Sequence, residues 1–459
     1  MNQLALLGGM PVREAPFCSI PRVDEREMEA VQSAIRAGLF SRFVGSNLPG
    51  TREALRKTSE ELRAEQGAFS FLGGPNVRRF EAEWALLHQV PYAVSVNSAT
   101  SGLTAILMAM DIGPGAEVIT TPLSFTATAA AIVAAQAIPV FADIDAETLC
   151  LDVASVERAI NSSTKAILYV HWCGNAGDFD RVLELAEKHG IPVIEDAAQA
   201  PGTVYQGKPL GTWGTAGVFS FSEPKNVMTG EGGMIVTSEV TIAEKCRLIR
   251  NHGEVVPELS DGDDFLRNVV GCNFRMVEIV AAMGWAQTER LPELNRIRNG
   301  NYRYLSAQLS EISCLTPQRI THPDTFAAYT AAFRWDYATA GVSRDAAAAA
   351  LRKEGIPVAT GVGRLMSDHP MFLRKLAYGG AGWPFSAEVD YNPARLPIAH
   401  RVHDKEYLGL FLMGWPNQEK DMDDIKLAFD KLTKNLSALR AYEKENTASQ
   451  LDYDRGRGR

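Results

Sequence analysis

Short apolar runs alternate with amphipathic stretches between Tyr92 and Leu248. The runs are rich in β-branched and aromatic residues, and several are separated by segments whose apolar residues recur at helical spacing. The pattern predicts strands at residues 92–96, 117–121, 138–144, 166–171, 192–195, 217–221 and 234–237, and helices at 102–110, 153–160 and 180–189. Such alternation builds βαβ units, and nearly continuous apolar strands are typical of a sheet buried on both faces. We therefore expect an α/β fold with a mostly parallel sheet covered by helices.

Long helical stretches follow this alternating region, including residues 278–291 and 298–309. The chain has 459 residues, which is more than one hydrophobic core normally serves. The sequence therefore predicts a large domain over residues 1–277 and a smaller C-terminal domain over residues 278–442. The polar end of the chain, residues 443–459, is expected to be a frayed tail.

One polar segment, Ser41 to Gly74, is longer than a plain connection needs. Its centre, residues 53–65, has helical spacing, and it separates an expected helix at 25–37 from another that begins near Asn76. It is either a surface excursion or dimer contact, which we favour, or a lid over a substrate.

Composition and charge exclude several functions. Hydrophobic residues make up 46% and charged residues 22%, as in ordinary globular proteins, and the net charge of -9 argues against broad binding of nucleic-acid phosphates. The six cysteines are scattered without a CxxC pair, which predicts free thiols and no metal site. Because the N-terminus lacks the features of a signal peptide and no segment reads as a membrane span, we expect a soluble cytoplasmic protein.

A lysine lies just beyond one predicted buried strand. Lys225 follows the segment from Phe219 to Pro224 and precedes the glycine-rich turn from Thr229 to Gly233. Lysine is rarely buried without a partner, whereas a lysine that forms a Schiff base must be neutral to react, and burial lowers its pKa. Considered without its neighbours, Lys225 would more often be an ordinary surface lysine. The residues around it favour the role of a Schiff-base lysine.

An acid ends another apolar strand. Asp196, in the segment from Glu195 to Gln199, would cost free energy there unless it were paired, and a protonated pyridine nitrogen is one suitable partner. Gln199 could then donate a hydrogen bond to a phenolic oxygen on the same ring. The alternative is that Asp196 only caps the next helix.

Two further strand ends carry candidate ligand contacts. Hydroxyl side chains between Asn97 and Gly102 precede a predicted helix, and the exposed N–H groups of a helix N-terminus favour binding of a phosphate. Thr100, Ser101 and Ser220 are therefore the expected phosphate contacts. The alternative is that these hydroxyls form an ordinary N-cap. Phe125 could stack on a pyridine ring, although a phenylalanine in the core is commoner.

Together these residues resemble the DegT/StrS family of sugar aminotransferases, which are fold-type-I enzymes that use pyridoxal 5'-phosphate (PLP). The most specific motifs are Glu195 to Gln199, Ser220-Phe221 before Lys225, and Gly230 to Gly233, in that order. The similarity begins at Gly8 to Val12, continues through most of the chain and ends strongly at Gly271 to Met276. The resemblance implies a three-layer αβα large domain that binds PLP and a smaller α+β C-terminal domain.

The resemblance also implies a role for each candidate. Lys225 would bind PLP covalently and carry the proton between the substrate's α-carbon and the cofactor, and Asp196 would hold the pyridinium. The remaining expected cofactor contacts are Gln199 on the phenolic oxygen, Phe125 on the ring, and Thr100, Ser101 and Ser220 on the phosphate. Asn273 matches an asparagine that reaches the phosphate across a dimer interface, which implies a homodimer with shared active sites. Arg275 is a candidate for binding the donor's carboxylate, with a structural salt bridge as the alternative.

The implied reaction moves an amino group from L-glutamate or L-glutamine to a nucleotide-linked keto-sugar or a keto-cyclitol. Members that remove a sugar hydroxyl carry histidine in place of Lys225, so the lysine favours transamination. Two alternatives stay open: a dehydratase or epimerising reaction on the same scaffold, and a non-catalytic PLP-binding regulator. The segment from His171 to Gly174 differs among members, and we expect its Trp to pack in the interior and its Cys to be buried. The region from Asp324 resembles the family only loosely. Because that region normally shapes substrate choice in the family, the identity of the acceptor stays open.

Overall fold

The computed structural model describes residues 3–18, 23–44, 51–65, 70–253, 270–386 and 388–446. Its centre is a seven-stranded sheet, which runs in the order β1 (Tyr92–Val96), β9 (Gly233–Thr237), β8 (Ala216–Ser220), β5 (Val193–Asp196), β4 (Thr164–Val170), β2 (Glu117–Thr120) and β3 (Ile138–Phe141). Only β9 is antiparallel to its neighbours β1 and β8. All seven expected strands are therefore present, and the prediction of a mostly parallel α/β sheet is confirmed.

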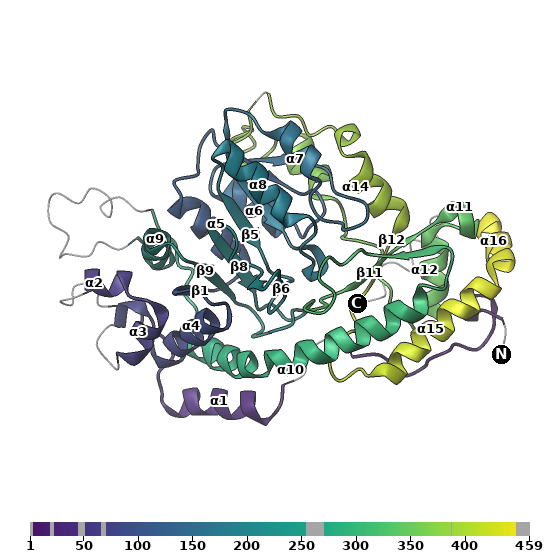
Figure 1. Ribbon diagram of the computed structural model, residues 1–459, viewed down its shortest axis with the longest axis horizontal. Helices are drawn as coiled ribbons and strands as arrows, with labels where there is room; N and C mark the ends of the chain where they lie inside the picture. Colours follow the sequence, from purple (N-terminus) through teal and green to yellow (C-terminus); the bar gives the residue numbers. More distant parts are fainter. Residues whose placement is uncertain are drawn as a thin grey trace.

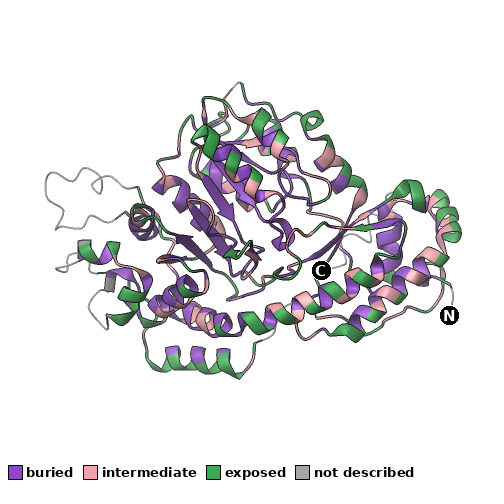
Figure 2. Ribbon diagram, in the orientation of Figure 1, coloured by how far each residue is buried: buried purple, intermediate pink, exposed green. Residues whose placement is uncertain are grey.

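Helices cover both faces of this sheet (Figure 1). One core contains residues of α5 (Ala99–Ala109), α6 (Ala127–Ala134) and α9 (Val240–Arg250), and the opposite core contains residues of α4 (Pro75–Leu87), α7 (Val153–Ala159) and α8 (Phe179–His189). The strands are apolar throughout because both of their faces are buried. In β8, for example, Val218 packs in the first core and the next residue, Phe219, packs in the second. The strands are accordingly buried in Figure 2. The arrangement is a three-layer αβα domain.

A smaller antiparallel sheet forms the second unit, in the order β10 (Leu315–Pro317), β11 (Ala331–Trp335) and β12 (Tyr407–Leu410). Its core also contains residues of α12 (Arg344–Lys353), α15 (Glu419–Lys434) and α16 (Leu436–Glu445). Smaller elements complete the chain: β6 (Val204–Tyr205), β7 (Lys208–Pro209), α11 (Tyr337–Ala340), α13 (Pro370–Leu373) and α14 (Pro397–Arg401).

The beginning of the chain packs with this second unit. Leu4 belongs to its core, and the backbone N–H groups of Ala5 and Val12 donate to the buried carboxylate of Glu354 at 2.7 and 3.0 Å. Figure 1 shows the N-terminus at the end of the molecule that carries α15 and α16. A division between residues 277 and 278 stays a proposal, and we propose to group residues 3–17 with the C-terminal unit.

One long helix, α10 (Glu278–Leu309), joins the two units. The expectation of separate helices at 278–291 and 298–309 is wrong, because the helix continues through Pro292. An interior proline costs about 3 kcal/mol of helix stability. Packing against α1 (Glu25–Arg36), α4 and α15 offsets that cost on both sides of the proline.

The polar segment before α4 is packed against the large unit. It contains α2 (Thr51–Arg56) and α3 (Ser59–Ala64), from which Leu55 and Leu62 join a small core with Leu248 of α9. The buried guanidinium of Arg247 donates to the carbonyls of Leu55 and Lys57 at 2.7 and 2.8 Å. Residues 45–50 and 66–69 lie outside the described residues. The packing of the rest supports a surface excursion rather than a lid.

Among the described residues, none of the helices combines the length and the apolar character of a membrane-spanning segment.

Gly284 sets the distance between α10 and α4. A Cβ atom at this position would lie 2.3 Å from the ring of Phe80, whereas a Cβ at Gly300, on the same helix, would meet no atom within 4 Å. We expect Gly284→Ala to lower the free energy of unfolding by roughly 1–3 kcal/mol through overpacking, and Gly300→Ala to raise it by up to about 1 kcal/mol through helix propensity. Denaturant unfolding of the two variants tests this, and equal stability of both would contradict it.

Candidate active site

The candidate residues gather where the parallel strands end. In the sheet, Gly233 of β9 is paired with Val96 of β1 and with Ser220 of β8, so these strand ends lie level with one another. Gly102 allows α5 to approach the sheet, because a Cβ there would lie 2.6 Å from Val218 Cγ2. The start of α5 is therefore placed beside Ser220. Carboxyl ends of parallel strands beside helix N-termini are the usual position of ligand sites in α/β folds.

Asp196 ends β5 and is 6% exposed. Its Oδ2 accepts a hydrogen bond from Thr128 Oγ1 at 2.8 Å, and its Oδ1 accepts one from the Ala198 N–H at 3.2 Å. Burial raises the pKa of this carboxyl group, while the two hydrogen bonds and the charges of Lys225 and His171 act in the opposite direction. Because burial prevails, the carboxylate can still accept a further cationic partner, as a protonated ring nitrogen would be.

Lys225 follows β8, and its positive charge interacts with the carboxylate of Asp196. Its Nζ lies 4.5 Å from the centroid of the Tyr329 ring, and its amine has no hydrogen-bond partner among the described residues. The loop around it is fixed by its neighbours, since Asn226 donates to the Ala327 carbonyl at 3.3 Å and the Met228 N–H donates to Gln287 at 2.8 Å. The structure thus brings a half-buried amine and a buried acid together on a supported loop.

Gln199 is oriented by a backbone contact that the sequence did not indicate. Its Oε1 accepts a hydrogen bond from the Cys173 N–H at 2.8 Å, which leaves its Nε2 as the donor for a phenolic oxygen. Cys173 adopts φ +61°, which is uncommon for a residue with a side chain. Trp172 and Cys173 are both buried, as expected from the sequence.

The start of α5 carries a helix cap built from serine side chains. Ser98 is the N-cap, and its Oγ accepts from the Ser101 N–H at 3.1 Å, while Ser101 Oγ donates to Asn97 Oδ1 at 2.6 Å. The capping alternative is therefore realised by Ser98 together with Ser101, whose Oγ accepts from the Ser98 N–H at 3.2 Å, and Thr100 takes no part in it. Thr100, Ser101 and Ser220 lie at the same edge of the sheet, and their contact with a phosphate stays a prediction.

Phe125 is 73% exposed, although large aromatic side chains are usually buried. It precedes α6, and its carbonyl accepts a hydrogen bond from the N–H of Thr128, whose hydroxyl contacts Asp196. The ring is thus outside the core and close in the chain to the candidate site, which fits stacking on a ligand.

Asn273 and Arg275 belong to one hydrogen-bond network. Arg275 Nε donates to Asn273 Oδ1 and Arg275 Nη1 donates to Asn251 Oδ1, both at 3.0 Å. Asn251 in turn donates to the Phe43 carbonyl at 2.9 Å, and Asn97 donates to the Asn273 carbonyl at 3.3 Å. Arg275 therefore has amide oxygens as its hydrogen-bond partners and contacts no carboxylate among the described residues. The reach of Asn273 across a dimer interface stays a prediction.

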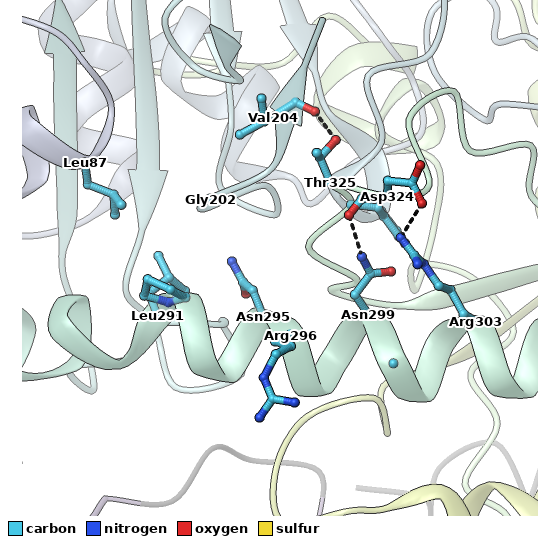
Figure 3. Close-up of a pocket in the computed structure, with 13 residues that line it drawn as sticks. Leu87, Gly202, Val204, Leu291, Asn295, Arg296, Asn299, Arg303, Asp324 and Thr325 are labelled. Carbon is cyan, nitrogen blue, oxygen red and sulfur yellow. Dashed lines mark hydrogen bonds and ion pairs between the residues drawn. The ribbon is translucent and has the colours of Figure 1, made fainter. Parts of the chain in front are cut away.

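A cavity of about 560 Å³ lies elsewhere, along α10 (Figure 3). Its walls include Leu87, Gly202, Asn295 and Phe326, and they contain none of the candidate site residues. Within the described parts of the chain, no group of three or more His, Cys, Asp and Glu residues is placed to hold a metal ion.

Sequence reasoning missed three neighbours of the site. Thr128 contacts Asp196, the Cys173 N–H contacts Gln199, and Tyr329 contacts Lys225. Each contact joins segments at least 26 residues apart, and no local spacing signals it.

Known proteins share both the sequence and the fold of this chain. It is 34% identical over 365 residues to the spore coat polysaccharide biosynthesis protein SpsC of Bacillus subtilis (strain 168), covering 77% of this chain and 92% of that protein. It is 30% identical over 455 residues to the L-glutamine:2-deoxy-scyllo-inosose aminotransferase of Streptomyces kanamyceticus, covering 96% and 99%. The crystal structure of DesI in the presence of its TDP-sugar product has a TM-score of 0.77 and 26% identity, covering 96% and 99%.

The profile of the DegT/DnrJ/EryC1/StrS aminotransferase family matches residues 54–408. This range contains the candidate residues of the site and extends from the polar segment before α4 into β12. The chain therefore belongs to the DegT/DnrJ/EryC1/StrS aminotransferase family.

Proposed function

We propose that this protein transfers an amino group from L-glutamine or L-glutamate to a keto-cyclitol, with PLP as its cofactor. The observation that carries the proposal is the pair of Asp196 and Lys225. A buried carboxylate that can take a further cation faces an amine without a hydrogen-bond partner among the described residues. A cofactor with a basic ring nitrogen and an aldehyde fits both groups.

The residues present fit PLP, and they can contact different parts of it. Asp196, oriented by Thr128, would keep the ring nitrogen protonated, and Gln199, oriented by the Cys173 N–H, would donate to the phenolic oxygen. Thr100, Ser101 and Ser220 would bind the phosphate at the start of α5, and Phe125 would cover one face of the ring. When bound, PLP supplies an electron sink for the substrate's α-carbon. Lys225 would remove and return the proton at that carbon.

A homodimer completes the proposal, with Asn273 contributing to the phosphate site of the partner subunit. Asn273 is exposed in the single chain, and its side-chain oxygen is held by Arg275. That arrangement leaves its Nδ2 group as a donor.

The keto-cyclitol is preferred as the acceptor because two relatives named for cyclitol ketones are 30–31% identical to this chain over nearly its whole length, whereas DesI is 26% identical. Two relatives from Streptomyces kanamyceticus match 95–96% of this chain and 99% of their own length. Their names are "Putative L-glutamine:3-amino-2,3-dideoxy-scyllo-inosose aminotransferase" and "L-glutamine:2-deoxy-scyllo-inosose aminotransferase". The spore coat relative covers 77% of this chain. Nucleotide-linked keto-sugars are the second candidate, since DesI was solved with a TDP-sugar product and covers 96% of this chain.

The test is an absorbance spectrum of the protein with PLP, recorded before and after addition of L-glutamine or L-glutamate without an acceptor. We expect the band of the lysine-bound cofactor to disappear with the donor and to return on addition of 2-deoxy-scyllo-inosose. A band that no amino acid discharges would contradict the aminotransferase reaction and favour a dehydratase or a PLP-binding regulator. Return of the band only with a nucleotide-linked keto-sugar would replace the acceptor class.

A further inference from the structure

Arg298 is an exception among the buried arginines. It lies on α10 and is 7% exposed, yet its guanidinium makes no hydrogen bond or ion pair with any residue that the structure describes. The other buried arginines of the described chain all have oxygen partners: Arg78 with Glu65, Arg247 with Leu55 and Lys57, Arg250 with Glu81, Arg290 with Glu27, and Arg344 with Thr360 and Tyr407.

An unpaired buried cation is costly, so this exception calls for a partner. A charge that is removed from water without a compensating partner destabilises the folded state. Burial lowers the pKa of Arg298 to about 10, so the guanidinium is still charged at neutral pH. Arg290, about two turns earlier on the same helix, shows the ordinary solution, because its Nη1 lies 2.5 Å from Glu27 Oε1. The missing counter-charge of Arg298 can come from a bound anion.

The surroundings of Arg298 are shaped around its guanidinium. A Cβ atom at Gly414 would lie 2.8 Å from Cζ and 2.8 and 2.9 Å from the two Nη atoms. The φ angle of Gly414 is not in the left-handed region, so what the missing side chain provides here is room for the guanidinium of Arg298 in its present position. Asn301 holds this segment on α10 by donating to the Met413 and Asn417 carbonyls at 2.9 and 3.0 Å.

The charged end of Arg298 is still accessible. Some guanidinium nitrogens of Arg247, Arg250 and Arg290 are fully enclosed and lack a hydrogen-bond partner. The nitrogens of Arg298 also lack a partner among the described residues, but none of them is fully enclosed. The small exposed remainder of the residue therefore includes its guanidinium nitrogens. A small anion can reach them without displacing a protein partner.

Arg298 interacts with Tyr329, a residue whose ring borders the candidate site. Tyr329 is the titratable group that interacts electrostatically with Arg298, and its ring lies 4.5 Å from Lys225 Nζ. Phe411, which follows β12, packs edge-on against Tyr329 with 5.4 Å between ring centroids. The amine of Lys225 and the guanidinium of Arg298 thus share Tyr329 as a neighbour.

We propose that Arg298 binds a carboxylate of the amino donor. The proposal rests on the proposed aminotransferase function and names the residue that recognises the amino acid. A guanidinium binds a carboxylate through two parallel hydrogen bonds, and both L-glutamine and L-glutamate carry that group. Arg275, the candidate from the sequence, is instead held by the amide oxygens of Asn251 and Asn273.

The test compares Arg298→Gln with Arg296→Gln in the PLP-loaded enzyme. Arg296 is an exposed neighbour on α10, and Figure 3 shows its side chain pointing away from Val204 and Thr325. For Arg298→Gln, we expect the dissociation constant of L-glutamine, measured by discharge of the cofactor band, to rise about a hundredfold or more. Arg296→Gln should match the wild type, and Arg298→Lys should recover part of the affinity. The return of the band with the keto acceptor should be unchanged in all three variants.

A second measurement separates donor binding from the reaction. Calorimetry with glutarate, a dicarboxylate without an amine, should show binding to the wild type and to Arg296→Gln, and binding weakened about a hundredfold or more in Arg298→Gln. Thermal unfolding should show no loss of stability in Arg298→Gln, because the substitution removes an uncompensated charge. Unchanged glutarate and glutamine affinities would overturn the proposal, and so would weakened acceptor binding with normal donor binding. If the wild type binds glutarate through Arg298 but no amino acid discharges its cofactor, the proposed function fails while the carboxylate site stands.

Discussion

Replacing Lys225 by alanine is expected to abolish turnover and the absorbance band of covalently bound PLP. The amine is the group that would join the cofactor and move the proton at the substrate's α-carbon, and proton transfer alone contributes on the order of 10²–10⁴-fold to rate. Since the amine of Lys225 has no hydrogen-bond partner among the described residues, its removal should leave the fold intact. Absorbance spectra with PLP and a steady-state assay with L-glutamine measure both effects.

Lys165 is the matched control for this substitution. It is exposed, and among the described residues its Nζ contacts only the Ser162 carbonyl, at 3.4 Å. Lys165→Ala should keep the band and the wild-type rate. If Lys225→Ala kept the covalent band, another lysine would carry the cofactor and the assignment of the site would be wrong.

Replacing Asp196 by asparagine should weaken PLP binding and slow the donor half-reaction, each by about a hundredfold or more. The substitution preserves the shape of the side chain but removes the negative charge that would pair with the ring nitrogen. Breaking a buried ion pair by removing one partner costs about 3–5 kcal/mol, which is at least a hundredfold in an equilibrium or rate constant. Titration with PLP and single-turnover reduction of the cofactor band test the two effects.

Asp143 provides the control, because it is also 6% exposed and follows a strand of the same sheet. Its oxygens accept hydrogen bonds from the backbone N–H groups of Ile144, Ile398 and Ala399 at 2.8–2.9 Å, so its contacts are structural. Asp143→Asn should lower thermal stability and leave PLP affinity unchanged. Equal effects of the two substitutions on PLP affinity would contradict a specific role for Asp196.

The candidate residues could be found from the sequence because each lies at a strand end. Asp196 closes a run of apolar residues and Lys225 follows another, and in a parallel sheet those ends meet at one edge. The contacts that tune them could not be found in this way. Thr128 is 68 residues from Asp196, and the amide of Gln199 depends on a backbone N–H in a left-handed turn at Cys173. Such contacts depend on the folded positions of distant segments and leave no local pattern.

The exposure of two residues was likewise decided by the fold. Phe125 fits a core position by composition alone, yet the structure leaves it 73% exposed beside the site. Arg298 fits an exposed helical position, yet it is buried between α10 and the segment that contains Gly414. In each case, the environment of the side chain is set by elements far away in the chain.

The sequence by itself determined the α/β class, the order of the strands along the chain and the positions of the lysine and the acid, because apolar periodicity and strand-end residues are local properties. Only the tertiary structure decided that α10 continues through Pro292, that Leu4 packs in the second core, and that Arg298 has no partner among the described residues. The physical reason is that packing energy between distant segments overrides local preference. Packing can offset the helix-breaking cost of a proline, and it can bury a charge whose counter-ion is expected to come from the substrate.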